Sequence, residues 1–523
     1  MIDEKLTHRL SPMDAFFLYV ETDEMPMHIG AVEIFDGEID FEQFKETIDS
    51  RLHKIPRYLQ RVIPAPFNLG HPTWEFDPDF NIDNHIFQLD LEAPATDDDL
   101  RDLANKLFEG PLDRDKPLWE AYVINGLSDG RSGLFMRVHH CMVDGIAGVG
   151  LMYVILDTLP DPPITEKKEM DPDPLPGANA RMFDALWDNA IEGIDTVTQL
   201  QKDLVEYGNG ATDLVSSAKE FASVMGDFLK PIKRLPFNQP FSGERRIGWA
   251  QFSFAEARAI RAALGGTVND VALTVLGGAV RKYMKRHGEP TRREFLRVLV
   301  PVNIRKDQDR GALGNHVAFL PAEVPLDVAD HVERFRQIHE TMQILKKERV
   351  ADAIHLMFSV LQGSSAPIQA SMLSAISRPL AQGMLGKIAK VPPLHMICTN
   401  VPGPQIPLYC TGHKMLEHYA LIPVAFEMGV TCGVTTYDQK MFVTLIADEQ
   451  ACPDVDALME YYEECFYELR EQAKVRPAEY VAIDRELKAR RRNAKGNGSS
   501  PASNGTSAPV AEESTSPEEA ETT

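Results

Sequence analysis

Apolar and polar positions follow two different periods along the first 160 residues. Strand-like stretches occupy 28–35, 117–126 and 133–140. Between the first two, apolar residues recur at helical spacing and predict a helix over 40–55. An alternation of strands and helices is typical of an α/β domain.

A second α/β region begins near residue 246. Its apolar patterns predict two helices and three strands, namely helices over 269–288 and 455–474 and strands over 295–305, 395–404 and 440–448. The chain is 523 residues long, more than one hydrophobic core usually serves, so two domains are expected.

The two regions are joined by a segment of different composition. Prolines and charges over 160–177 indicate a linker. Apolar stripes at helical spacing then cover 182–207 and 212–229. These stripes pack on the domains or face a membrane surface, and the small number of Lys and Arg on their polar faces weakens the membrane interpretation.

The end of the chain lacks any hydrophobic period. It is rich in Ser, Gly, Pro, Thr and Glu, a composition that cannot offset the entropy lost on ordering. We therefore predict a disordered tail over 491–523, and divide the rest into domains at 1–160 and 246–490 with a linker over 161–245.

Charge and cysteine content narrow the function. With 54 basic and 78 acidic side chains the formal charge is −24, which argues against nucleic-acid binding. The six cysteines form no CxxC pair, so a reducing compartment is expected. Neither an export signal nor a membrane-spanning apolar run is recognised, and we expect a cytoplasmic protein with peripheral membrane or lipid-inclusion contact left open.

The stretch RVHHCMVDGIAG, residues 137–148, holds two adjacent histidines at the end of a predicted strand. Side chains alternate along a strand, so His140 shares a face with apolar Met136 and Val138, and His139 points the opposite way. Two imidazoles on opposite faces do not bind one metal ion, and we expect no metal. A histidine on an apolar face is often only a core residue, so His140 needs further support as a catalytic residue.

That support comes from the residues that follow. Asp144 and Gly145 precede the helix-like run IAGVGLMYVILD, and the simplest role for Asp144 is a helix N-cap that fixes the turn after His140. Cys141 is interpreted as a small buried hydrophobe because its own face of the strand offers no paired base.

The pattern HHxxxDG resembles the active-site motif of the superfamily that contains chloramphenicol acetyltransferase, peptide-synthetase condensation domains and bacterial wax ester synthase/acyl-CoA:diacylglycerol acyltransferases. Further segments resemble the last family and follow its order along the chain: LSPMDAFFLYVE (10–21), PLW (117–119), SGERR (242–246), TVNDVALTVLGGAVRKY (267–283), PVNIR (301–305), LGNHVAFLP (313–321) and TNVPGP (399–404). Cys141 and the asparagine in PVNIR depart from the more familiar residues.

The resemblance implies an α/β fold of two chloramphenicol acetyltransferase-like domains, each a mixed sheet flanked by helices, with a tunnel between them. It also implies His140 as the general base, with His139 and Gly145 as supporting motif residues. Asn269 is implied as an oxyanion donor, with Asp270 beside it. Asn269 could equally cap the helix that follows it.

Asp144 completes the expected catalytic set, and we expect it to brace the loop after His140 and not to transfer protons, with Arg305 or Arg61 as its partner. The implied reaction is acyl-CoA-dependent esterification of diacylglycerol, long-chain fatty alcohols or both, giving triacylglycerol and wax esters. No cofactor is implied, since coenzyme A enters with the donor, and no oligomeric state is predicted. Two alternatives stay open: a condensation-type acyltransferase that uses a carrier-protein thioester, and an inactive lipid-binding homologue.

Overall fold

The computed structural model describes residues 9–66, 69–143, 145–163, 165–168, 232–303, 317–347, 366–377 and 394–478, together with the single positions 177 and 182. Apart from these positions, the predicted helices over 182–207 and 212–229 and the predicted tail lie outside the described residues.

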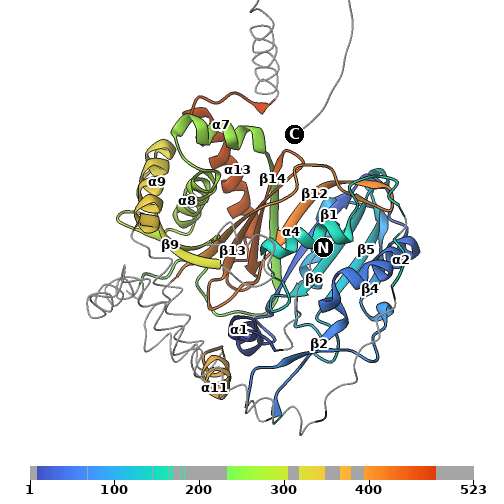
Figure 1. Ribbon diagram of the computed structural model, residues 1–523. Coiled ribbons are helices and arrows are strands. Elements are labelled where there is room, and N and C mark those ends of the chain that lie inside the picture. Colours follow the sequence, from blue (N-terminus) through green and yellow to red (C-terminus); the bar gives the residue numbers. More distant parts are fainter. Residues whose placement is uncertain are drawn as a thin grey trace, which may run out of the picture. The chain divides into compact units, whose positions relative to one another are not determined.

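Within the described residues the strands form two six-stranded sheets and one two-stranded sheet (Figure 1). The first sheet has the order β11-β12-β1-β6-β5-β4. Its strands are β1 (His28–Phe35), β4 (Ile86–Ala95), β5 (Trp119–Leu127), β6 (Ser132–His139), β11 (Tyr409–Cys410) and β12 (His413–Leu421). Only the β4–β5 pair is parallel among the pairings described for this sheet.

The second sheet has the order β7-β14-β13-β10-β8-β9. Its strands are β7 (Arg245–Ser253), β8 (Phe295–Asn303), β9 (Val317–Pro325), β10 (Met396–Pro402), β13 (Val430–Tyr437) and β14 (Lys440–Asp448). Strand β10 runs parallel to both of its neighbours, so this sheet is mixed. The small sheet pairs β2 (Gln60–Ile63) with β3 (Thr73–Phe76).

The helices are α1 (Pro12–Val20), α2 (Phe41–Arg51), α3 (Asp97–Leu107), α4 (Gly145–Ile155), α7 (Phe254–Leu264), α8 (Val268–Arg286), α9 (His331–Lys347), α11 (Ala366–Ser377) and α13 (Val455–Gln472). Short 3-10 turns cover Leu52–Lys54, Pro56–Leu59, Ile82–Asn84 and Ser128–Gly130. Helices α8 and α13 lie against the second sheet and share its core (Figure 1). The predicted α/β class with mixed sheets is confirmed.

Most predicted elements match the structure closely. The strands over 28–35 and 440–448 have the predicted bounds, and the helix expected over 269–288 is α8. The helix expected over 40–55 ends at Arg51. The chain then continues as two 3-10 turns, Leu52–Lys54 and Pro56–Leu59, and the second of these begins with a proline.

One strand crosses between the two halves of the chain. Strand β12 comes from the second half, but it pairs antiparallel with β1 of the first sheet over Gly30–Phe35. Hydroxyl groups of the second sheet also bond to it, since Thr435 donates to the His418 carbonyl at 3.2 Å. Strand β12 therefore joins the two sheets.

Candidate active site

His140 follows directly after the last residue of β6 and is held by two other segments. Its backbone N–H donates to the Met27 carbonyl at 2.8 Å. Its ring stacks on Phe17 of α1, with ring centroids 4.0 Å apart and planes inclined by 5°. The main chain and the ring plane of His140 are thus fixed by groups on both sides.

His139 points to the other side of the sheet, as the alternation of side chains predicts. It is fully buried. Its Nδ1 accepts the Cys141 backbone N–H at 3.2 Å, so the proton of a neutral ring lies on Nε2, 3.3 Å from Glu21 Oε1. The Leu118 carbonyl accepts the His139 N–H at 2.9 Å, so the PLW segment holds the main chain of the histidine turn.

Glu21 connects the two supports of the histidine turn. Its side chain is 3% exposed and lies 2.7 Å from Arg114 as well as beside His139. Burial opposes its ionisation, but the hydrogen bond from His139, with the charge of Arg114 and the hydrogen bond from the Met27 N–H, outweighs burial and lowers the pKa of Glu21 to about 2. Its Oε1 also accepts the Met27 N–H at 2.9 Å. The ionised carboxylate therefore holds His139 and the residue to which His140 is bonded.

Cys141 lies between these groups but has no catalytic character. Its side chain is buried, and burial raises the pKa of the thiol well above its usual value. A protonated thiol is a poor nucleophile. The structure agrees with the interpretation of Cys141 as a packing residue.

A cavity of about 790 Å³ lies in front of His140. Leu134, Met136, Val138 and His140 all line it, as expected for one face of a strand. Further lining residues come from α1, β1, α4 and β12, and from β8, β9 and β10 of the second sheet. The lining is mainly apolar, and the volume is in the range of cavities that hold small molecules or single lipid chains.

Two of the predicted site residues, Asp144 and Arg305, lie outside the described residues. Gly145 is the first residue of α4. Arg61, the other partner considered for Asp144, lies 3.7 Å from Asp77 and donates to the Asp115 carbonyl at 3.2 Å.

Asn269 is not the N-cap of α8, so that alternative is wrong. Thr267 is the N-cap, because its side chain accepts the Asp270 N–H while the Asp270 carboxylate accepts the Thr267 N–H. This reciprocal pair starts the helix before Asn269. Asp270 also accepts a hydrogen bond from His339 Nδ1 at 2.9 Å, so its carboxylate braces the start of α8.

The structure does not bring Asn269 to the wall of the cavity. Asn269 is absent from the described residues that line the cavity. Its buried Oδ1 has no hydrogen-bond partner anywhere in the described part of the chain. The cavity wall instead contains a different side-chain amide, Asn400 of β10. The role of Asn269 as oxyanion donor stays a prediction.

Sequence reasoning missed three groups of this site. Phe17 and Glu21 fall in the segment 10–21, and Asn400 falls in TNVPGP, but both segments contributed only to the resemblance. The contacts of these residues are long-range: Phe17 and His140 are far apart in the chain, and no local pattern predicts that their rings stack. The available signal was only that these residues fall inside segments that resemble the family.

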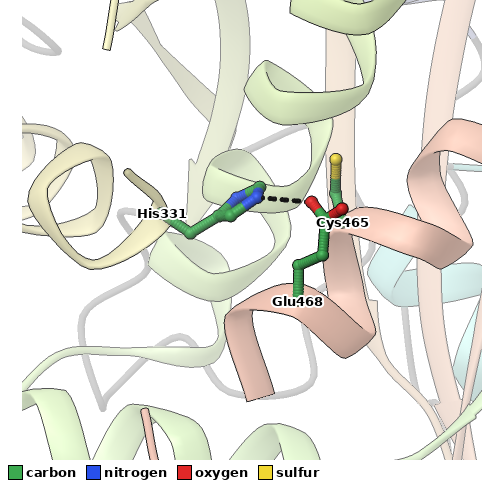
Figure 2. A group of neighbouring side chains, drawn as sticks. All are labelled: His331, Cys465 and Glu468. Atoms are coloured by element: carbon green, nitrogen blue, oxygen red, sulfur yellow. Dashed lines mark hydrogen bonds and ion pairs between the residues drawn. The ribbon is translucent and has the colours of Figure 1, made fainter. Parts of the chain in front are cut away.

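A second group of side chains, His331, Cys465 and Glu468, offers potential metal ligands (Figure 2). His331 Nε2 lies 2.8 Å from Glu468, and Arg334 lies 2.9 Å from His331 Nδ1. A guanidinium only donates, so Nδ1 accepts and Nε2 holds a proton that is donated to Glu468. A protonated Nε2 has no lone pair for a metal ion.

The charges around this group also disfavour a cation. Lys282 lies 2.8 Å from Glu468, and burial raises the pKa of Cys465 to about 12. We interpret His331 and Glu468 as part of a hydrogen-bonded network between α9 and α13, with Cys465 close beside it.

No single helix among the described residues has both the length and the apolar character needed to cross a bilayer. By length and composition alone, the pair Phe254–Leu264 and Val268–Arg286 passes together, with a bend of 97° between its members.

Comparison with known proteins adds a family to this geometry. Residues 10–272 match the model of the wax ester synthase/diacylglycerol acyltransferase catalytic domain, and residues 313–470 match the model of the C-terminal domain of the same family. The Mycobacterium tuberculosis protein named "Probable diacyglycerol O-acyltransferase tgs1" is 26% identical over 93% of this chain and 98% of its own length.

Solved structures show the same fold. The wax ester synthase/diacylglycerol acyltransferase from Marinobacter aquaeolei VT8 superposes with a TM-score of 0.60 at 22% identity, covering 90% of this chain and all of that one. The first condensation domain of the calcium-dependent antibiotic synthetase gives 0.55 at 14% identity, covering 90% of this chain and 97% of the domain. The chain belongs to the wax ester synthase/diacylglycerol acyltransferase family.

Proposed function

We propose that this protein transfers a long acyl chain from coenzyme A to the hydroxyl group of diacylglycerol or of a long-chain alcohol, with His140 as the general base. One observation supports this most directly: a histidine fixed by Met27 and Phe17 lies on the wall of a large apolar cavity. Apolar walls bind lipid chains, and an imidazole on such a wall is suited to proton transfer.

The proposed chemistry needs one base and one site for negative charge. An alcohol is too weak an acid to ionise before it attacks, so His140 takes the hydroxyl proton as the oxygen bonds to the thioester carbonyl carbon. The tetrahedral intermediate then collapses, the carbon–sulfur bond breaks, and the coenzyme A thiolate receives the proton from His140. No acyl-enzyme is required when both substrates occupy the cavity together.

The negative charge on the carbonyl oxygen needs a hydrogen-bond donor. Asn269 is the donor that the family resemblance implies. Asn400 is a second candidate donor, since its side-chain amide lies on the cavity wall. Loss of a single aimed donor typically costs about 3–4 kcal/mol of transition-state stabilisation, or ~10²–10³ in kcat. Comparison of Asn269→Ala with Asn400→Ala would assign the role.

The proposed substrates also suggest a location for the protein in the cell. Diacylglycerol and fatty alcohols reside in membranes or lipid inclusions, so we propose peripheral contact with such a surface in the cytoplasm. Co-sedimentation of the purified protein with dioleoylglycerol-containing vesicles tests this contact.

The proposed activity is measured as thiol release from palmitoyl-CoA with and without hexadecanol or dioleoylglycerol. Release that depends on the acceptor, with the ester identified by chromatography, supports the proposal. Binding of palmitoyl-CoA without release in the presence of either acceptor contradicts it and favours an inactive lipid-binding protein. A side-by-side acceptor panel then separates diacylglycerol from alcohol preference.

A further inference from the structure

The cavity contains a buried acidic residue that the proposed chemistry does not use. Glu33 of β1 and His418 of β12 both line it, and their backbones are direct partners in the antiparallel β1–β12 pair. Glu33 Oε1 lies 3.3 Å from His418 Nδ1. Glu33 is 4% exposed and His418 is 8% exposed, so the pair is removed from bulk water.

The two oxygens of the Glu33 carboxylate are not equivalent. Oε2 is buried and makes no hydrogen bond to any described residue. A buried acceptor without a donor is unfavourable, so this oxygen favours a ligand group that donates a hydrogen bond. The neighbours of the pair on the cavity wall are mainly apolar, and Thr435, another lining residue, uses its hydroxyl to bond the His418 carbonyl.

The position of the pair along the cavity follows from strand register. Glu33 is opposite Leu134 on β6, and Leu134 precedes His140 by six residues, which is about 20 Å of strand. The hydrocarbon core of a bilayer is about 30 Å for two opposed leaflets, so one long chain spans at least about 15 Å. Chains in a fluid leaflet are partly folded, so a fully extended chain of about sixteen carbons is longer than this, about 19 Å at ~1.3 Å per C–C bond. With its reacting end at His140, its far end comes close to Glu33 and His418.

We propose that Glu33 and His418 form a polar specificity site that selects long chains bearing a hydroxyl group at the far end. This inference rests on the proposed function and concerns substrate choice. A terminal hydroxyl donates to Glu33 Oε2, whereas a terminal methyl at the same depth leaves this buried oxygen without a donor. Short chains do not reach the pair and are indifferent to it.

The test is an equilibrium binding measurement that does not depend on turnover. In His140→Ala protein, a bound fluorescent sixteen-carbon fatty acid is displaced by hexadecanol or by hexadecane-1,16-diol. The same displacements are made in His140→Ala protein that also contains Glu33→Leu and His418→Leu. Replacement of a buried polar pair by apolar residues is commonly tolerated by the fold, and Glu33→Gln is the polar control of similar shape.

The quantity compared is the ratio of hexadecanol to diol affinity in each protein, because the diol is intrinsically more hydrophilic. We expect the doubly leucine-substituted protein to shift this ratio about tenfold toward hexadecanol, the scale of one hydrogen bond to a charged group. Glu33→Gln should shift it less, and decanol against decane-1,10-diol should not shift.

An unchanged sixteen-carbon ratio in the leucine-substituted protein overturns the inference, as does an equal shift for the ten-carbon pair. Turnover is measured separately on protein that retains His140. Absence of acceptor-dependent thiol release there, together with the expected binding shift, would contradict the proposed function and leave the specificity site standing.

Discussion

At the scale of single residues, the histidine turn depends on a carboxylate from another segment. Glu21 accepts from Met27, pairs with Arg114 and lies beside His139, and these contacts fix the main chain on either side of His140. Glu21 is absent from the described residues that line the cavity, so it is a positioning residue. Its effect on the reaction passes through the aim of the imidazole.

Glu21→Gln should lower kcat by about tenfold to a hundredfold and leave KM for palmitoyl-CoA nearly unchanged, because small displacements of a catalytic group are costly while the cavity is retained. Steady-state kinetics with dioleoylglycerol measure both constants. Asp23 is an exposed acidic residue two positions further along the chain, so Asp23→Asn is the matched control and should behave as the parent protein.

His139→Ala should reduce turnover less than loss of His140, but destabilise the fold more, since it removes a fully buried ring between Glu21 and Cys141. If Glu21→Gln raised KM for palmitoyl-CoA by the same factor as it lowered kcat, the positioning role of Glu21 would be contradicted. A His139→Ala protein as stable as the parent would contradict the structural role of the buried ring.

At the scale of elements, local patterns predict the helices and strands better than their partners. Strand β1 and helix α8 follow from local apolar patterns, although the Thr267–Asp270 pair that starts α8 was not recognised in the sequence. The pairing of β12 with β1 depends on contacts between residues almost four hundred positions apart. Such long-range pairing leaves no periodic signal in the sequence, so the polar pair Glu33–His418 was not predictable either.

Helix α8 also shows why two adjacent glycines interrupt an otherwise apolar helix. A Cβ at Gly277 would lie 2.3 Å from Val324 Cγ1, and one at Gly278 would lie 2.8 Å from Cys465 Sγ. The helix therefore packs close to β9 on one side and α13 on the other.

Gly277→Ala should destabilise the protein by about 1–3 kcal/mol, because the overpacking strain exceeds the gain in helix propensity. Urea denaturation followed by circular dichroism measures the change in the free energy of unfolding. Gly288→Ala, just beyond the end of α8, has no atom near its Cβ but a positive φ of 71°, so it separates backbone strain from packing. A Gly277→Ala protein more stable than the parent would contradict the packing argument.

At the scale of the whole molecule, several buried histidines link stability to pH. Burial, with the charge of Arg137, lowers the pKa of His28 to about 3. Burial, with the charge of Arg9, lowers the pKa of His71 to about 4. Burial lowers the pKa of His395 to about 4, and its Nδ1 accepts the Arg297 N–H, which only a neutral ring can do.

The folded protein should therefore lose stability as the pH falls from 7 toward 4. Below an unfolded-state pKa near ~6.5 the unfolded chain binds protons that these rings do not bind, so unfolding becomes more favourable. Each ring contributes up to about 1.4 kcal/mol per pH unit between that value and its folded pKa.

Urea titrations at pH 7.5, 6.5, 5.5 and 4.5 measure this slope. His395→Gln should reduce it, while His413→Gln should not, since the His413 side chain is 40% exposed. A free energy of unfolding that is constant over this range would contradict the account.

The predicted tail gives a separate expectation for the whole chain. Its composition lacks the apolar residues needed to form a packed surface. Removal of residues 493–523 should leave kcat and KM unchanged in the palmitoyl-CoA assay. A large fall in turnover for a folded, truncated protein would show that the tail contributes to the reaction or to delivery of the lipid substrate.

The family-level chemistry was predictable because HHxxxDG and the other segments lie in local sequence. The support of His140 by Phe17, Met27 and Glu21 was not predictable from the sequence. It depends on how helix α1 and the residues just before β1 pack against the end of β6.

The central claim is that the His140 imidazole takes the proton of the attacking alcohol. The most direct measurement is ester formation from palmitoyl-CoA and hexadecanol by folded His140→Ala protein, with circular dichroism and probe binding to establish that the cavity is intact. We expect a loss of at least about a hundredfold in kcat, the scale of general base catalysis, with the probe still bound. Turnover within a few fold of the parent protein would contradict it.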